Sequence, residues 1–290
     1  MTVAEDAPGL SSAEIISGGG VVVAELPRTR ACADVARSFV RDMLKGLLPE
    51  RLGDALVMAS ELAANAFIHG LGAREIEDHQ APTAARSELT IYRRGAGTGA
   101  ELVCTVFDPR PNVDAIPERT PCVLSDLPDK RCDETLPPEL LDGLLEQLET
   151  GNRGLDVVRA LSHGRTGFYR TRSRLGDRSV SGKVAWFALP IPAQSPAAWP
   201  PVNSLSPAQA AKELRNQLDG RGIGRIYHND LPGQSVLSAP HVTVWCRGQH
   251  FMWRTDDVAV RHPFSDVVEA AEQVVRISED REYARLGPIS

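Results

Sequence analysis

The sequence predicts an α/β protein followed by a small α+β unit, and three observations lead to this prediction. First, strand and helix patterns follow one another in the order strand 21–27, helices 28–48 and 52–68, strands 87–94 and 100–108, and strands 166–175 and 182–190. Second, residues 190–207 contain six prolines, a composition typical of a semi-rigid linker. Third, an aromatic hairpin near 242–254 lies between two further helical segments, 208–219 and 266–277.

These patterns divide the chain into four parts. Residues 1–14 are small, polar and acidic, and we expect a disordered leader there. Residues 15–192 form the α/β domain, 193–207 the proline-rich linker, and 208–290 the small α+β domain. Because proline-rich boundaries are usually crossed by few contacts, the last domain is expected to be separable.

Composition restricts the class of protein and its partners. The 290 residues are 42% hydrophobic and 24% charged, with a formal net charge of -6. This balance argues against electrostatic binding to nucleic acid or to an anionic membrane. The five cysteines form no CxxC pair, which fits reduced thiols, and no apolar run approaches ~18 residues. A cytoplasmic protein without direct nucleic-acid or membrane contacts is expected.

The helix at 52–68 is apolar nearly all round, yet Glu61, Asn65 and His69 recur along it at intervals of four. Such a helix is buried, and a buried carboxylate is costly unless a partner meets it. Either an arginine from elsewhere pairs with Glu61, or the carboxylate and amide face a metal-bound polyphosphate. Mg²⁺ prefers oxygen ligands and keeps several waters, so one amide oxygen from Asn65 is enough. His69 is expected to cap or pack at the helix end.

Two later segments favour the polyphosphate interpretation. Asp108 lies where an apolar strand meets a loop, and a carboxylate there can accept a hydrogen bond from an exocyclic amine. Gly151 and Gly154 precede a helix, where glycines let the backbone approach phosphate and the helix N-terminus supplies free N–H groups. Arg110 and Arg153 lie beside these positions and are candidates for phosphate contact, although solvent exposure of Arg153 is an equal alternative.

The order of these motifs resembles that of the Bergerat-fold (GHKL-type) ATPases, and most of all their anti-sigma-factor serine kinases. Residues 59–70, "ASELAANAFIHG", are similar to the N box, 104–111 and 151–158 to the two glycine boxes, and 182–190 to the closing strand. The resemblance covers about residues 20 to 192 and implies a two-layer α/β sandwich with a mixed, mostly antiparallel sheet. Val184 stands where the closing strand of the family often carries a threonine.

The resemblance also implies roles for individual residues. Glu61 would be the catalytic general base, Asn65 the Mg²⁺ ligand, and Asp108 the acceptor for the adenine amino group. ATP or ADP with Mg²⁺ would be the cofactors. Phosphate binding would fall to the second glycine box, that is to Gly151, Gly154 and the amide of Leu155.

The function that the resemblance implies is ATP-dependent regulation of transcription through a protein partner. The partner would be a sigma factor, an anti-sigma antagonist or another transcription regulator, and a serine of the antagonist would be phosphorylated. Two alternatives remain open: nucleotide only orders a lid so that a partner docks, or a degenerate module acts through its C-terminal domain. Homodimer formation is also left open.

Three other features of the sequence lead to structural predictions. The proline-rich segment 109–150 is interpreted as a lid over the nucleotide, with a short helix at 138–149. Arg170, Arg172 and Arg174 alternate and so share one sheet face, expected to be solvated rather than to grip an acidic partner. Trp245, Phe251 and Trp253 should form most of the core of the last domain, with some aromatic surface left for a protein partner.

Overall fold

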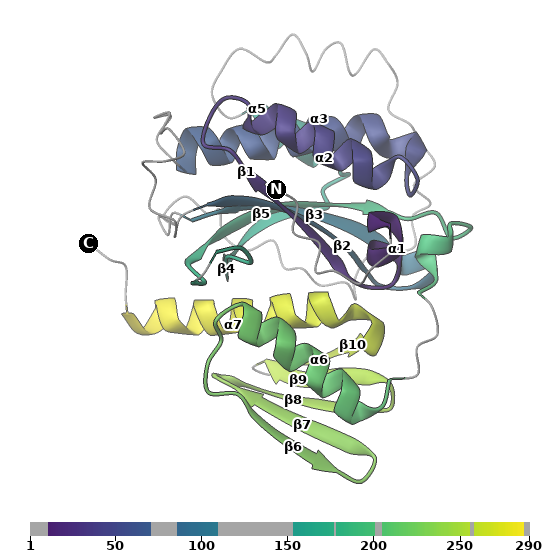
Figure 1. The fold of residues 1–290 in the computed structure, drawn as a ribbon, viewed down its shortest axis with the longest axis vertical. Coiled ribbons are helices and arrows are strands. Elements are labelled where there is room, and N and C mark those ends of the chain that lie inside the picture. The colour runs from purple at the N-terminus through teal and green to yellow at the C-terminus, as the bar shows by residue number, and fades with distance from the viewer. Residues whose placement is uncertain are drawn as a thin grey trace.

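The computed structural model describes residues 11–70, 86–109, 153–176, 178–200, 205–255 and 258–286. The α/β prediction is confirmed: the described chain contains two five-stranded sheets with helices packed against them (Figure 1). Every strand pair in these ranges is antiparallel, so the expected parallel component of the sheet does not occur among the described strands. The predicted lid, 109–150, lies outside the described residues except for Pro109.

The first sheet contains the predicted strands of the α/β domain, in the order β1-β2-β3-β5-β4. Its strands are β1 (Val21–Leu26), β2 (Ser87–Arg94), β3 (Glu101–Asp108), β4 (Thr166–Arg172) and β5 (Ser181–Pro190). Alternate residues of β3, namely Leu102, Cys104 and Val106, are buried in the core beneath the helices. The period of two in the sequence therefore sets which face of each strand meets this core.

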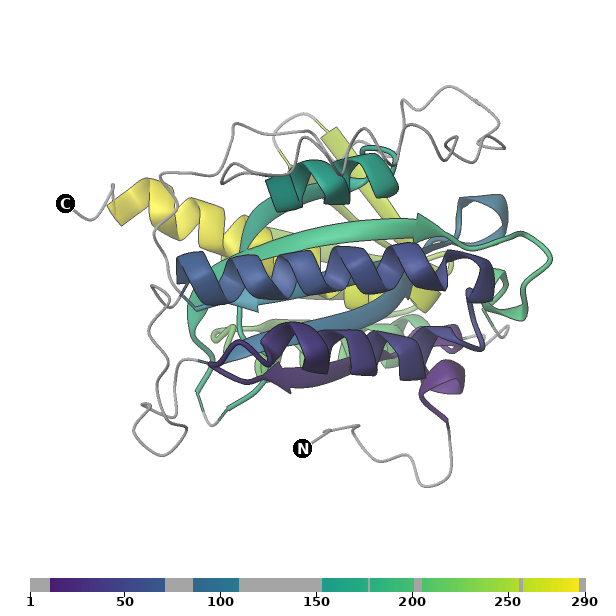
Figure 2. The same ribbon diagram turned by 90° about the horizontal axis from the view of Figure 1, so that it is seen from above.

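Three helices cover that face, as Figure 2 shows from above: α2 (Cys32–Leu44), α3 (Leu52–Asn65) and α5 (Arg153–Leu161). The helical spacing of Ala36, Phe39 and Val40 gives α2 one apolar face, and all three side chains are buried. On α3, Met58 and Leu62 are buried in the same core. A short helix, α1 (Ser12–Ser17), overlaps the end of the expected leader; Ser11 and Glu14 form its capping box.

The C-terminal part of the chain contains a five-stranded sheet and two helices, whereas the sequence predicted only one hairpin between two helices. The helices are α6 (Pro207–Gly220) and α7 (Val267–Leu286), the latter longer than predicted. The strands run in the order β10-β9-β8-β7-β6: β6 (Tyr227–Leu231), β7 (Gln234–Ala239), β8 (Val242–Arg247), β9 (His250–Thr255) and β10 (Val258–Pro263). Phe251 and Trp253 are buried as expected, whereas Trp245 remains 39% exposed.

Helix α7 covers the second face of the first sheet (Figure 1). The arginines of β4 and of the residues after it do not face solvent either, because β4 is the edge strand and these side chains pair with acidic residues of α7; the expectation of a solvated face is wrong. Arg170 Nη1 lies 3.5 Å from Asp280 Oδ1, and Arg172 Nε lies 2.5 Å from Glu279 Oε1. The acidic partner of this row is a helix of the same chain.

Glu272 of α7 connects three separate segments through one buried carboxylate. Its Oε1 accepts a hydrogen bond from Thr171 Oγ1 at 2.6 Å. Its Oε2 accepts from Arg174 Nη2 at 2.8 Å and from Arg221 Nη1, at the end of α6, at 2.6 Å. Although burial by itself raises the pKa of Glu272, Arg221 and Arg174 lower it to about 2. The carboxylate therefore stays ionised in the interior.

Apolar and polar contacts extend this interface along β2. Tyr92 is buried beside Val103, Ala188 and Val268, and its hydroxyl donates to Glu269 Oε2 at 2.8 Å. The side chain of Arg93, which is fully buried, lies 3.6 Å from Asp266 through Nη2 and Oδ1. The expectation that few contacts cross the proline-rich boundary is therefore wrong.

The connection between β4 and β5 is held by a second buried carboxylate. Glu88 on β2 is 1% exposed, and it accepts backbone N–H bonds from Arg174 at 2.7 Å and from Leu175 at 2.8 Å. Burial raises the pKa of Glu88, and these two amides oppose that rise. Within the described ranges, no helix combines the length and apolar composition needed to cross a membrane.

Glu272→Gln tests the importance of the buried carboxylate. Removing the charge leaves Arg174 and Arg221 buried without compensation, so we expect the free energy of unfolding to fall by about 3–5 kcal/mol at pH 7. Urea unfolding followed by circular dichroism measures this difference. Glu282→Gln is the matched control, because that side chain on the same helix is 46% exposed; equal losses in both variants would contradict the expectation.

The difference between wild type and Glu272→Gln should also depend on pH. The pKa of Glu272 is about 2 in the folded protein, against 4.5 ordinarily. A lowered pKa stabilises the fold above the unfolded value, and that contribution is lost as the pH falls through the folded value. Unfolding curves between pH 7 and pH 3 should show the two proteins converging below pH 4.5. A constant difference over this range would show that the variant acts through packing alone.

Candidate functional site

The polar stripe of α3 faces α5 with two side chains that have no polar partner among the described residues. Glu61 and Asn65 are half-buried, and neither side chain makes a hydrogen bond or ion pair with another described residue. The alternative in which an arginine pairs with Glu61 therefore finds no such arginine in the described ranges. The burial of Glu61 is partial, so its carboxylate destabilises the fold less than a fully buried one would.

Gly154 places the start of α5 directly against both side chains. A Cβ atom built on Gly154 would lie 2.4 Å from Glu61 Oε2 and 3.5 Å from Asn65 Nδ2. Only glycine leaves room for the Glu61 carboxylate at this distance. The first N–H groups of a helix have no acceptor within it, so they lie next to a carboxylate and an amide here.

Asn65 is the most informative of the three residues. Its Nδ2 is buried and has no hydrogen-bond partner in the described part of the chain. Buried amide donors are nearly always satisfied, and an anionic oxygen would satisfy this one. Asn65 ends α3, and the chain continues as a π-helical turn, Ala66–Gly70. Such turns recur at functional sites. The side chain of His69, in this turn, lies outside the described part.

Asp108, the last residue of β3, belongs to the same layer. Leu102, Cys104 and Val106 face the helices, and the period of two puts Asp108 on that face as well. Its side chain is almost completely buried, and Lys183 Nζ of β5 lies 3.2 Å from its Oδ2. The two residues are opposite each other in the β3–β5 register. This carboxylate is thus already neutralised by a neighbouring strand.

The remaining predicted residues divide into three groups. Arg110 and Gly151 lie outside the described residues, as does the side chain of Arg153, the first residue of α5. Leu155 packs its side chain against the core, which leaves its backbone amide as the group able to meet a ligand. Val184 shares a face with Ala188, which packs toward α7, so it lies on the opposite side of the sheet from Asp108.

Lys183 is the site residue that the sequence analysis missed. The alternation of Lys183, Ala185 and Phe187 gives the only signal, because it places the lysine on the helix-facing side with the core residues. That signal does not identify Asp108 as its partner. The pairing depends on the register of two strands about 75 residues apart in the chain.

The described residues could bind a metal ion only if water or a bound phosphate supplied most of its ligands. No cluster of three or more His, Cys, Asp and Glu side chains suitable for a metal ion occurs among them. One amide oxygen, from Asn65, remains compatible with Mg²⁺, since this ion takes its other ligands from water and phosphate. The unpartnered Asn65 Nδ2 and the space at Gly154 fit a phosphate group beside that ion.

Comparison of the chain with protein-family models, with curated proteins and with solved structures finds no match. The candidate site is therefore argued from its own geometry: a carboxylate, an amide and a glycine meet at a helix N-terminus, and an aspartate lies on the same face of the sheet.

Asn65→Leu separates a functional amide from a structural one. Because Nδ2 has no partner, an apolar side chain of similar size should leave the free energy of unfolding unchanged or raise it by about 1–2 kcal/mol. Chemical unfolding measures the change. Ser60→Ala on the same helix is the control, since Ser60 Oγ donates to the Val57 carbonyl. A loss above about 1 kcal/mol in Asn65→Leu would indicate a structural hydrogen bond instead.

Proposed function

We propose that residues 15–192 form a Bergerat-type ATP-binding domain of the anti-sigma-factor serine kinase kind. The observation that carries the proposal is the contact of Gly154 with Glu61 and Asn65, together with the unpartnered Asn65 Nδ2. The N-box-like segment of α3 and the glycine turn before α5, almost 90 residues apart in the chain, come into contact at these residues. An arrangement that served only the fold would satisfy these polar groups.

The roles of the residues follow from their chemistry. Asn65 would hold Mg²⁺ through its carbonyl oxygen, and the amides at Gly154 and Leu155 would donate to phosphate oxygens. Glu61 would accept the proton of an attacking serine hydroxyl, while bound Mg-ATP supplies the transferable phosphoryl group. Most of the rate would come from positioning and charge neutralisation, as in phosphoryl transfer generally. Arg110, Gly151 and Arg153 remain candidates for further phosphate contacts.

Asp108 would recognise adenine through its exocyclic amino group. Its carboxylate already meets Lys183, and a carboxylate with two oxygens can accept from a second donor. The positive charge of Lys183 lies 3.2 Å from Asp108 Oδ2 and so balances the charge of the carboxylate at this point of the sheet. In the competing structural explanation, Asp108 and Lys183 are only a cross-strand ion pair.

The proposed biological role is nucleotide-dependent binding of a protein partner in the cytoplasm. The partner would be a sigma factor, an anti-sigma antagonist or another transcription regulator, with or without phosphorylation of a serine. The net charge of -6 supports a protein rather than a nucleic acid or a membrane as the partner. Homodimer formation is compatible with this role.

Calorimetric titration with Mg-ATP tests the adenine assignment. Asp108→Asn presents an amide to the adenine amino group, and we expect the binding free energy to weaken by about 1–3 kcal/mol. Asp34→Asn, at an exposed carboxylate on α2, should bind as wild type. If Lys183→Met and Asp108→Asn lower only the thermal stability and leave binding intact, the residues are an ion pair and not an adenine site.

Glu61→Gln and Gly154→Ala test the chemistry and the contact separately. Glu61→Gln should retain ATP affinity but lose any transfer of phosphate to a serine substrate. Gly154→Ala should displace the Glu61 carboxylate and weaken ATP binding at least tenfold, while the melting temperature changes little, since alanine favours a helix. Calorimetry and radiolabel transfer provide the measurements. A wild type that binds ATP but never transfers phosphate would favour the non-catalytic regulator.

A further inference from the structure

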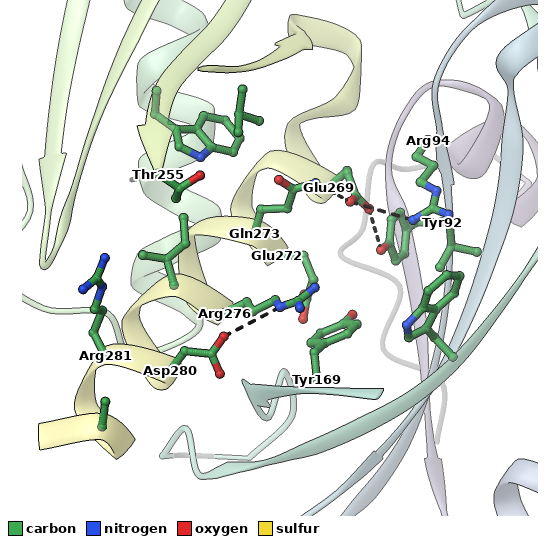
Figure 3. Close-up of a pocket in the computed structure, with 16 residues that line it drawn as sticks. Tyr92, Arg94, Tyr169, Thr255, Glu269, Glu272, Gln273, Arg276, Asp280 and Arg281 are labelled. Atoms are coloured by element: carbon green, nitrogen blue, oxygen red, sulfur yellow. Dashed lines mark hydrogen bonds and ion pairs between the residues drawn. The ribbon is translucent and has the colours of Figure 1, made fainter. Parts of the chain in front are cut away.

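A cavity lies on the side of the first sheet opposite the candidate nucleotide site, between that sheet, α7 and the second sheet (Figure 3). Its volume is about 450 Å³, within the range of small-molecule sites, which often form between packed units. None of the residues proposed to bind nucleotide lines it. Its described walls include Tyr92, Arg94, Tyr169 and Trp186 from the first sheet, Trp253 and Thr255 from the second, and Gln273, Arg276, Asp280 and Arg281 from α7.

The charged groups in the described walls cancel. Three arginines, Arg94, Arg276 and Arg281, are balanced by three carboxylates, Glu269, Glu272 and Asp280. These groups are also paired within the protein: Arg94 lies 3.9 Å from Glu269 and Arg276 lies 3.8 Å from Asp280, while Glu272 accepts from Arg221, which lies outside the walls. A charged ligand would have to break such pairs, so the cavity favours a neutral one.

Four aromatic side chains are among the described residues that line the cavity, and two of them lie beside arginines. The guanidinium carbon of Arg94 lies 5.1 Å from the ring centroid of Trp186, and that of Arg276 lies 5.5 Å from the ring of Tyr169. Indole, phenol and guanidinium planes all stack well on planar ligands. This lining favours a planar aromatic molecule over a flexible aliphatic one.

Trp253 indicates that a ligand of this cavity would need a hydrogen-bond acceptor. Its side chain is 2% exposed, and its Nε1 has no hydrogen-bond partner in the described chain. A buried indole N–H normally donates to an acceptor. On α7, Gln273 Nε2 donates to Glu269 Oε1 at 2.9 Å, so the carbonyl of Gln273 is left to accept from a ligand. One wall thus offers a donor and another an acceptor.

We propose that this cavity binds a neutral, planar heteroaromatic molecule carrying an amide or lactam group. The ligand carbonyl would accept from Trp253 Nε1, its N–H would donate to Gln273, and its ring would stack in the aromatic walls. Because the cavity is lined by both sheets and by α7, a bound ligand strengthens the packing of the C-terminal unit on the first sheet.

Ligand-observed NMR and calorimetry with nicotinamide, uracil and indole-3-carboxamide test the proposal on the full chain. At least one of these three probes should bind saturably and raise the melting temperature. Nicotinate, which differs from nicotinamide by its negative charge, should bind at least tenfold more weakly than nicotinamide. Absence of binding by all three probes, or equal binding of nicotinate, overturns the proposal.

Three variants locate the site. Trp253→Phe keeps an aromatic ring but removes the donor, and should weaken binding roughly three- to tenfold. Ala284→Trp, at an exposed residue of the lining, should block the cavity and abolish binding without disturbing the core. Trp245→Phe is the matched control on the outer face of the second sheet and should bind as wild type. Wild-type affinity in Ala284→Trp overturns the assignment even if Trp253→Phe fails to fold.

Discussion

The buried carboxylate of Glu272 is the contact on which the arrangement of the two sheets depends. It joins the end of α6, the middle of α7 and two positions of the β4 region through Arg221, Arg174 and Thr171. A buried ion pair contributes little stability over an apolar contact, but an unpaired charge there is very costly. The network therefore acts mainly by excluding other packings, since any shift of α7 leaves an arginine without its partner. The cavity beside Glu272 exists because this packing is fixed.

Short-range rules predicted the strands of the first sheet and the shared side of Glu61 and Asn65, whereas the meeting of these residues with Gly154 was expected only from the resemblance to Bergerat-fold ATPases. Alternation defined the strands of this sheet, and the spacing of four placed the two polar side chains on one side of α3. The same rules failed for β6, whose sequence "YHNDL" is polar because it forms an exposed edge strand. They also missed Lys183, since its partner is set by strand register.

The arginine row shows a second reason why sequence patterns did not predict the structure: contacts between segments far apart in the chain. Alternation placed Arg170 and Arg172 on one face of β4, but it did not show that all three arginines, Arg174 included, pair with an acidic helix that begins nearly a hundred residues later. The proline-rich stretch suggested two independent units, yet Ala197 and Ala198 within it are buried in the first core. Local composition indicates where a chain turns, but it does not indicate how much surface is buried beyond that point.

Glu88 has a consequence for how this chain tolerates change. It holds the connection between β4 and β5 through backbone amides, so substitutions at Leu175 leave that contact in place. Arg174 is more restricted, since its side chain also donates to Glu272. An insertion between Arg174 and Leu175 would separate the two amides that Glu88 binds, whereas β5 would keep its register because its buried face fixes the pairing with β3. The connection can therefore change its side chain at Leu175, but neither the side chain of Arg174 nor the spacing of these two residues.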